Sequence, residues 1–283
     1  MKRTLSFLLT LLMLVTSLPM NAFIALAQEL TAETQATAVS VDSFRGKTVS
    51  ILSHSASTYD GVSSNTAYNS TIGDNDVYYT EGRHGVYRKD TWWQQVIDVL
   101  DMRLLVNNSW SGSCVLQPRK GEASVTYKDR AVNLHNDHTG EEPDIIWVYI
   151  GGNDFAYYKD TYGKAADVDY VALIKANGDG SYTYAEPTTT CEAYAITLHK
   201  AATRYPEAEI YCITSTARRE VDYTGDSYPD AGQPTEYSAQ LWEVAAHFGY
   251  PVVDLEKAIP KDVEIFDSLM GDKRAHPNAE GYF

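Results

Sequence analysis

The chain has 283 residues, of which 38 are Asp or Glu and 23 are Lys or Arg, so its formal net charge at pH 7 is −15. A surface this acidic repels nucleic acid and anionic membranes, which argues against either as a partner. The same charge suits a soluble protein whose substrate is neutral or cationic.

Residues 1–27 have the pattern of a secretory signal peptide. Lys2 and Arg3 form a positively charged start, an apolar stretch runs from Leu5 to Leu18, and Ala25-Leu26-Ala27 is a small-x-small cleavage site. We therefore expect cleavage after Ala27 and a secreted, extracellular protein. An uncleaved membrane anchor is the alternative, because the apolar stretch with its continuation to residue 27 is just long enough to span a bilayer.

The mature chain is expected to contain one folded domain. Residues 28–45 are rich in Ala, Thr and Glu without periodicity and predict a flexible leader. Residues 46–283 suffice for one α/β domain with a large core and are too few for two. Cys114, Cys191 and Cys212 cannot all pair with one another. Cys212 lies in an apolar run, which favours a buried thiol over a disulfide framework.

Strand-like and helix-like segments alternate along this domain. Buried strands are expected at residues 48–52, 104–106, 144–150, 209–214 and 252–255, and helices at residues 90–100, 188–205 and 235–248. Strands separated by helices require right-handed crossovers. The pattern therefore predicts a parallel sheet covered by helices on both faces, which is a three-layer α/β/α sandwich.

Two tyrosine-rich stretches, residues 59–89 and 156–186, interrupt the alternation. Each follows the carboxyl end of a predicted strand, where long loops form binding walls or lids. Asn177-Gly178-Asp179-Gly180 in the second stretch predicts a hairpin turn. The tyrosine rings either form a wall for sugars or aromatic acyl groups, or only pack the loops onto the domain.

Residues that suit acyl-transfer chemistry lie in loops that a parallel sheet would bring together. Ser55 directly follows the first strand and is the candidate nucleophile, with an ordinary serine-rich turn as the alternative. His276 is the candidate base, because Asp272 closely precedes it and Pro277 follows it. Asp272 would hold the imidazole in the required tautomer and stabilise the imidazolium.

The tetrahedral intermediate of such a reaction needs hydrogen-bond donors for its oxyanion, each typically worth about 3 kcal/mol. Three candidates follow predicted strands. They are the backbone N–H groups of Ser55 and Gly112 and the side-chain amide of Asn153.

These residues lie in four blocks that resemble the SGNH or GDSL hydrolases, a family of serine esterases and acylhydrolases. In the family's order, the blocks are Ser53–Gly61, Asn107–Ser113, Gly151–Phe155 and Asp272–Gly281. The resemblance implies a flavodoxin-like α/β/α sandwich with a five-stranded parallel sheet. It also implies that Ser55 attacks an ester carbonyl and that His276 acts as base and then as acid. Gly112 and Asn153 would complete the oxyanion hole.

The chain departs from the family pattern at both ends of the site. The first block normally reads Gly-Asp-Ser, but Ser53 and His54 precede Ser55 here. His54 either contacts the substrate or is a tolerated neighbour that points away from the hydroxyl. Losing the glycine places a side chain where the backbone is usually tightest.

The family's acid stands three residues before the histidine, whereas Asp272 stands four before His276 and Lys273 occupies the matching position. Either the loop bulges and Asp272 serves, or the site is a Ser–His dyad, since Asp267 is further away. The last block should open a final helix at Asn278, and that helix is expected to be missing from the sequence as given.

No metal or cofactor is expected. The sequence has no GxGxxG, Walker loop or CxxC, and no twelve-residue calcium loop with its glycine and terminal glutamate. His135 and His138 lack a third ligand at metal spacing. The acidic residues that lie in Gly- and Asn-rich loops are predicted to be solvated turn residues; they are Asp60, Asp74, Asp76, Asp179 and Asp226.

The sequence therefore predicts a secreted serine esterase that removes a small acyl group or cleaves a carbohydrate-linked ester. A catalytically weak or silent carbohydrate-binding module on the same fold is the alternative, motivated by the altered first block and the displaced Asp272. Acyl transfer to a sugar instead of water would use the same residues.

Overall fold

The structure is a computed structural model that describes residues 41–63, 77–116, 125, 129–214, 235–255, 262–272 and 275–282. The predicted signal peptide and most of the predicted leader lie outside these residues. The helices are α3 (Trp92–Val99), α4 (Gly152–Tyr157), α5 (Tyr170–Leu173), α6 (Thr190–Arg204), α7 (Thr235–His247) and α8 (Val263–Leu269). None of the described helices is both long and apolar enough to cross a membrane.

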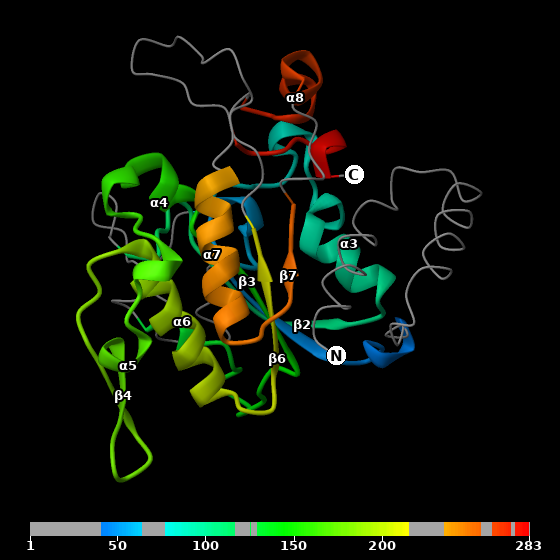
Figure 1. Ribbon diagram of the computed structural model, residues 1–283. Coiled ribbons are helices and arrows are strands. Elements are labelled where there is room, and N and C mark those ends of the chain that lie inside the picture. Colours follow the sequence, from blue (N-terminus) through cyan, green and yellow to red (C-terminus); the bar gives the residue numbers. More distant parts are fainter. Residues whose placement is uncertain are drawn as a thin grey trace, which may run out of the picture.

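A five-stranded parallel sheet forms the centre of the domain (Figure 1). Its strands are β1 (Thr48–Ser53), β2 (Arg103–Ser109), β3 (Ile145–Tyr149), β6 (Glu209–Ile213) and β7 (Val252–Val253). They lie in the order β2-β1-β3-β6-β7, and every neighbouring pair is parallel. This is the flavodoxin-like order. The predicted fold class is therefore confirmed.

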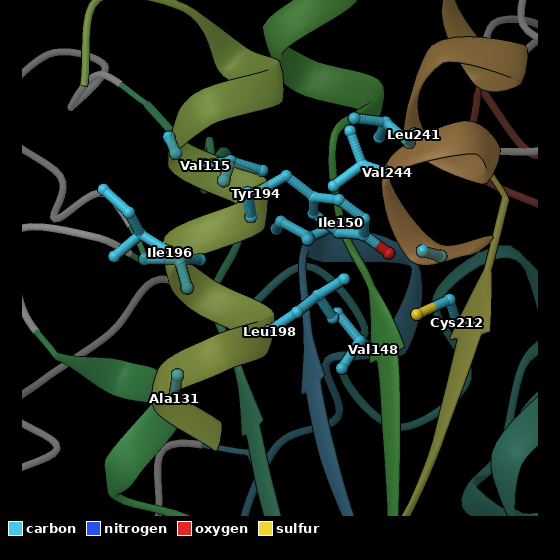
Figure 2. Packing of buried hydrophobic residues seen from close by; sticks show 14 of the residues in the cluster. Val115, Ala131, Val148, Ile150, Tyr194, Ile196, Leu198, Cys212, Leu241 and Val244 are labelled. Carbon is cyan, nitrogen blue, oxygen red and sulfur yellow. The ribbon is translucent and has the colours of Figure 1, made fainter. Parts of the chain in front are cut away.

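Side chains of the central strand β3 alternate between two apolar cores, as a strand with helices on both faces requires. Ile146 and Val148 pack into one core with residues of α6 and α7, and Figure 2 shows this cluster between the helices and the sheet. Ile145 and Trp147 pack into the other core, which contains Trp93 of α3. The helices α6 and α7 therefore cover one face and α3 covers the other (Figure 1).

The predicted strands and the three predicted helices are present, with boundaries shifted by a few residues. The helix expected from residue 188 begins at Thr190, because Thr189 caps it and exchanges hydrogen bonds with Glu192 in a capping box. The predicted turn joins the antiparallel strands β4 (Ile174–Ala176) and β5 (Tyr182–Tyr184). Cys212 is buried and free, and burial raises the pKa of its thiol to about 12.

Two helices near the site have no counterpart among the predicted elements. α4 spans six residues and begins with a glycine, so its sequence lacks an apolar period. α8 is also short, and Asp262 caps it by accepting the backbone N–H groups of Glu264 and Ile265. α4 has no side-chain cap and depends on neighbouring segments, whereas α8 depends on its cap more than on an amphipathic pattern.

Candidate active site

The carboxyl ends of three adjacent strands coincide at one edge of the sheet. Ser53 at the end of β1 is in register with Ser109 of β2 and with Tyr149 of β3. The segments after these strands carry Ser55 in a 3-10 turn, Gly112 in a loop and Asn153 in the first turn of α4. Their assembly thus follows from strand register, because each residue lies only two to four positions beyond an aligned strand end.

Ser55 opens a short 3-10 turn, η3 (Ser55–Ser57), whose backbone carbonyls are all hydrogen-bonded. The Ser55 carbonyl accepts the N–H and hydroxyl of Thr58 at 3.1 and 2.8 Å. The Ala56 carbonyl accepts the hydroxyl of Tyr282 at 2.6 Å, and the Ser57 carbonyl accepts the Asn107 amide at 2.9 Å. These bonds hold the turn, and with it the position of the Ser55 hydroxyl.

A continuous hydrogen-bonded chain joins Ser55, His276 and Asp272. His276 Nε2 lies 2.7 Å from Ser55 Oγ, and His276 Nδ1 lies 2.5 Å from Asp272 Oδ2. Ser55 is 6 % exposed, whereas the side chains of His276 and Asp272 are 18 % and 23 % exposed. The hydroxyl can therefore pass its proton to the imidazole, whose other nitrogen faces a carboxylate.

The loop between α8 and the end of the described chain sets the spacing of Asp272 and His276. The Gly271 N–H donates to the His276 carbonyl at 2.8 Å, and Met270 forms an antiparallel bridge with Pro277. Asp272 Oδ1 accepts the backbone N–H groups of Ala275 and His276 at 2.9 and 3.1 Å. Asp272, rather than Asp267, is therefore the carboxylate bonded to the His276 ring, although it stands four residues before it. Lys273 lies outside the described residues.

Asp272 is held as a carboxylate. Burial would raise its pKa, but the hydrogen bond and charge of His276 and the two backbone N–H groups outweigh burial and lower the pKa well below its ordinary value. A charged carboxylate beside Nδ1 favours the tautomer that leaves Nε2 free to accept a proton from Ser55.

Two of the three predicted oxyanion donors, Gly112 and Asn153, lie next to Ser113. Gly112 occupies the left-handed region at φ 75° in a turn closed by the Ser113 N–H and the Trp110 carbonyl. Asn153 Nδ2 donates to the Ser113 carbonyl at 2.9 Å, which ties α4 to this turn. Within the described residues, the N–H groups of Ser55 and Gly112 donate to no protein acceptor. They are thus available to an oxyanion.

Asp154, which was not among the predicted site residues, anchors the segment that follows the Gly112 turn. Its carboxylate accepts the Val115 N–H at 2.8 Å and the Leu116 N–H at 3.0 Å, and Thr190 of α6 contacts it at 3.4 Å. Burial raises the pKa of Asp154 to about 6, with the backbone N–H groups acting in the opposite direction. The buried carboxylate therefore fixes the chain after Gly112 next to the start of α4.

Arg130, in η6 (Arg130–Val132), is a second residue that the sequence did not reveal. It is 2 % exposed and donates to the Ser53 carbonyl at 2.9 Å and to the side chain of Asn108 at 3.1 Å. It also donates to the Asn108 carbonyl and to Ser113 Oγ. Burial lowers its pKa to about 9. One guanidinium thus joins the ends of β1 and β2 to the Gly112 turn.

The two unusual residues before Ser55 are accommodated by buried contacts. Ser53 Oγ lies 2.7 Å from Ser57 Oγ, which also accepts the indole N–H of Trp92 at 3.0 Å. His54 Nδ1 accepts the Ala56 N–H at 3.3 Å, and its ring lies against Tyr149 with 4.7 Å between centroids. His54 is 9 % exposed, so its ring belongs to the interior beneath η3.

The tyrosines of residues 59–89 do not all have one role. Tyr59 and Tyr79 are buried, and the Tyr79 hydroxyl donates to the Pro277 carbonyl at 2.8 Å. Tyr78 is half-buried and stacks on His276. Tyr87 is 47 % exposed, and Tyr68 lies outside the described residues. Packing of the loop therefore accounts for two of these rings, while Tyr78 reaches the site itself.

No group of three or more potential metal ligands occurs among the described residues. His135 Nδ1 lies 2.9 Å from the Tyr205 hydroxyl, and His138 is exposed beside Asp137. Asp74, Asp76 and Asp226 lie outside the described residues.

The fold and the hydrogen-bonded Ser55–His276–Asp272 chain define the class as an α/β protein with the site geometry of a serine hydrolase. Residues 47–226 match the family model described as GDSL-like Lipase/Acylhydrolase, so this chain belongs to that family. The match includes Ser55, Gly112 and Asn153. It ends before Asp272 and His276, which only the tertiary structure brings to the same place.

Solved structures share the fold. A protein from Bacteroides ovatus ATCC 8483 assigned as a GDSL-like lipase is 23 % identical, with 84 % of this chain and 92 % of that chain covered and a TM-score of 0.52. A second, from Bacteroides uniformis ATCC 8492, is 22 % identical, with 84 % and 90 % covered and a TM-score of 0.53. No curated protein sequence matches this chain significantly.

Proposed function

We propose that this protein is a secreted serine esterase that hydrolyses a small-acyl or carbohydrate-linked ester. The observation that carries the proposal is the chain of two short hydrogen bonds from Ser55 Oγ through the His276 ring to Asp272. Family membership supports an acylhydrolase in general.

In the proposed acylation step, Ser55 Oγ attacks the carbonyl carbon of the ester as His276 Nε2 takes its proton. The carbonyl π electrons move onto oxygen, and Asp272 stabilises the imidazolium. When the tetrahedral intermediate collapses, the alcohol leaves with the proton from His276, and the acyl group stays on Ser55. Water then attacks the acyl-enzyme by the same route, with His276 first as base and then as acid.

The proposed oxyanion hole consists of the N–H groups of Ser55 and Gly112 and the Asn153 amide. Asn153 uses one N–H for the Ser113 carbonyl, which fixes the amide plane and leaves its second N–H for the oxyanion. These donors are held before substrate arrives, so little reorganisation is needed in the transition state.

Access to Ser55 and the charge of the chain support the proposed substrate class. The near-complete burial of Ser55 supports a small acyl group, because a bulky one would have to displace the packed residues around η3. The net charge of −15 supports a neutral or cationic substrate. A sugar hydroxyl in place of water would turn the same steps into acyl transfer.

Ser55→Ala tests the proposal. It should abolish hydrolysis of p-nitrophenyl acetate and labelling by a fluorophosphonate, whereas Ser268→Ala, which alters an exposed serine on α8, should leave both unchanged. Undiminished turnover in Ser55→Ala would overturn the proposal. Wild-type protein that takes up no fluorophosphonate but binds glycans would instead favour the silent binding module.

Export is proposed from the sequence of residues 1–27. Expression of the full chain in a secreting bacterium should yield protein in the culture medium whose N-terminal residue is Gln28. Retention of the unprocessed chain in the membrane fraction would point to an uncleaved anchor.

A further inference from the structure

Tyr78 lies flat on the imidazole of His276. The two ring centroids are 3.5 Å apart and the ring planes differ by 12°. The guanidinium of Arg83 also lies over the Tyr78 ring, with its Cζ 4.0 Å from the ring centroid. The stack covers one face of the imidazole and opposes its rotation away from Ser55.

The Tyr78 hydroxyl also reaches the acid of the site. It donates to Asp272 Oδ2 at 3.4 Å, the same oxygen that faces His276 Nδ1, and it lies 2.9 Å from His84 Nε2. A phenol has one proton, so when it donates to Asp272 it accepts from His84. The hydrogen-bonded chain therefore runs from His84 through Tyr78 and Asp272 to His276 and Ser55.

Backbone features hold His84 in this place. His84 has φ 55°, a left-handed conformation that is unfavourable for a residue with a side chain and that persists where surroundings impose it. Its ring packs on Gly271, next to Asp272, and a Cβ at Gly271 would lie 2.3 Å from His84 Cγ. Gly271 thus makes room for His84. Burial, followed by the charge of Asp272, raises the pKa of Tyr78 to about 12, so the phenol keeps its proton at neutral pH.

We propose that Tyr78 is a positioning residue for His276 and Asp272, and that His84 orients Tyr78. The proposal rests on the proposed function, since it assigns Tyr78 to the same reaction. The Tyr78 ring keeps the imidazole of His276 in its plane, and the π face of the Tyr78 ring stabilises the imidazolium. The Tyr78 hydroxyl and the His276 ring both hydrogen-bond to the same carboxylate, that of Asp272. Among the described residues, the polar and titratable groups near Tyr78, His276 and Asp272 include Ser55, Arg83 across the stack, and the edge of Tyr79. They also include Tyr282, which interacts electrostatically with Tyr78 and Asp272.

Three variants separate these contributions in steady-state hydrolysis of p-nitrophenyl acetate. Tyr78→Leu keeps apolar volume without a flat face and should lower kcat by about 10- to 100-fold with KM little changed, as misorientation of a catalytic group does. Tyr78→Phe keeps the stack but loses the hydroxyl that helps to orient the Asp272 carboxylate, so it should lower kcat by only about threefold. The matched control is Tyr211→Phe, which removes a phenol–carboxylate bond to Glu209 at the opposite end of the sheet and should change neither constant.

The role of His84 in orienting Tyr78 is tested by comparing two variants, His84→Ala and His84→Gln. His84→Ala should lower kcat by less than Tyr78→Leu, because the phenol loses its donor but stays in place. His84→Gln retains an N–H donor and should recover part of that loss. Equal kcat values for these two variants would remove His84 from the proposal.

Titration of the His276 ring by NMR tests the contact between Tyr78 and the His276–Asp272 pair without relying on turnover. The His276 signal is assigned by its absence from the spectrum of His276→Gln. Tyr78→Phe frees Asp272 for a stronger bond to the imidazolium and should raise the pKa of His276 by about half a unit. If the wild type has no esterase activity but this shift occurs, the proposed function fails and the positioning role stands. An unchanged pKa together with an unchanged kcat would overturn the positioning role. A raised KM at constant kcat in Tyr78→Leu would also overturn it and make Tyr78 part of the substrate wall.

Discussion

Asp272→Asn separates the charge of Asp272 from its backbone contacts. The amide oxygen can keep both bonds of Oδ1 to the backbone N–H groups of Ala275 and His276. The amide NH2 then occupies the position of Oδ2, 2.5 Å from His276 Nδ1. Two donors cannot face each other at this distance, so the imidazole must carry its proton on Nε2, where it cannot accept one from Ser55.

The expected loss follows from the charge interaction. Opposite unit charges about 4 Å apart attract by about 4 kcal/mol at an effective dielectric constant of about 20. At about 1.4 kcal/mol per factor of ten, losing this attraction for the imidazolium lowers kcat by about a thousandfold. The fold should survive, because the loop contacts of Oδ1 are retained.

The measurement is kcat for p-nitrophenyl acetate, with Asp267→Asn on α8 as the control of matched chemistry. We expect Asp267→Asn to retain wild-type activity. An Asp272→Asn enzyme within tenfold of the wild type would refute the reasoning and indicate a Ser–His dyad. A large loss of kcat in Asp267→Asn, with Asp272→Asn little affected, would show that Asp267 and not Asp272 is the catalytic carboxylate.

The same variant changes how stability depends on pH. Because folding lowers the pKa of Asp272, its contribution to stability is complete above its unfolded value near 4 and is lost as the pH falls toward the folded value. The wild-type melting temperature should therefore fall more steeply than that of Asp272→Asn between about pH 5 and pH 3. If the melting temperatures of the two proteins fell in parallel over this pH range, the predicted direction of the pH dependence would be contradicted.

Two further predictions concern the supports of the oxyanion turn. Arg130→Lys cannot make all the bonds of the buried guanidinium, so we expect a melting temperature lower by about 5–10 °C and a kcat lower by about tenfold, measured by calorimetry and steady-state kinetics. Unchanged values for both would show that the network is dispensable. Gly151→Ala forces a side chain into φ 109° with its Cβ 2.4 Å from Leu241 Cδ1, so it should lower both stability and kcat, because α4 must shift with Asn153. Gly178→Ala, which has open space around it, is the control, and equal melting temperatures for the two variants would contradict the prediction.

The first block, in which Ser53 and His54 precede Ser55, shows what the sequence alone could not decide about the site. In the sequence alone, Ser53 and His54 indicate a first block that departs from the family pattern. The structure places both side chains in buried contacts under η3, where His54 caps the turn and Ser53 joins the bonded hydroxyl of Ser57. The displacement of Asp272 by one position is likewise absorbed by the loop that contains it, so neither departure removes the Ser55–His276–Asp272 geometry.

Local pattern was enough for the order of strands and helices and for the strand ends after which Ser55, Gly112 and Asn153 stand. Those features depend on apolar spacing and on residues a few positions apart, which a sequence displays directly. His276 was selected by its neighbours in sequence and by the family resemblance, whereas its contact with Ser55 is decided by the tertiary structure. Arg130, Asp154 and the Tyr78–His84 pair escaped prediction because each acts through contacts with segments far away in the chain. A buried arginine or a stacked tyrosine has no distinctive neighbours in sequence, and only the closing of the sheet and its loops gives it a partner.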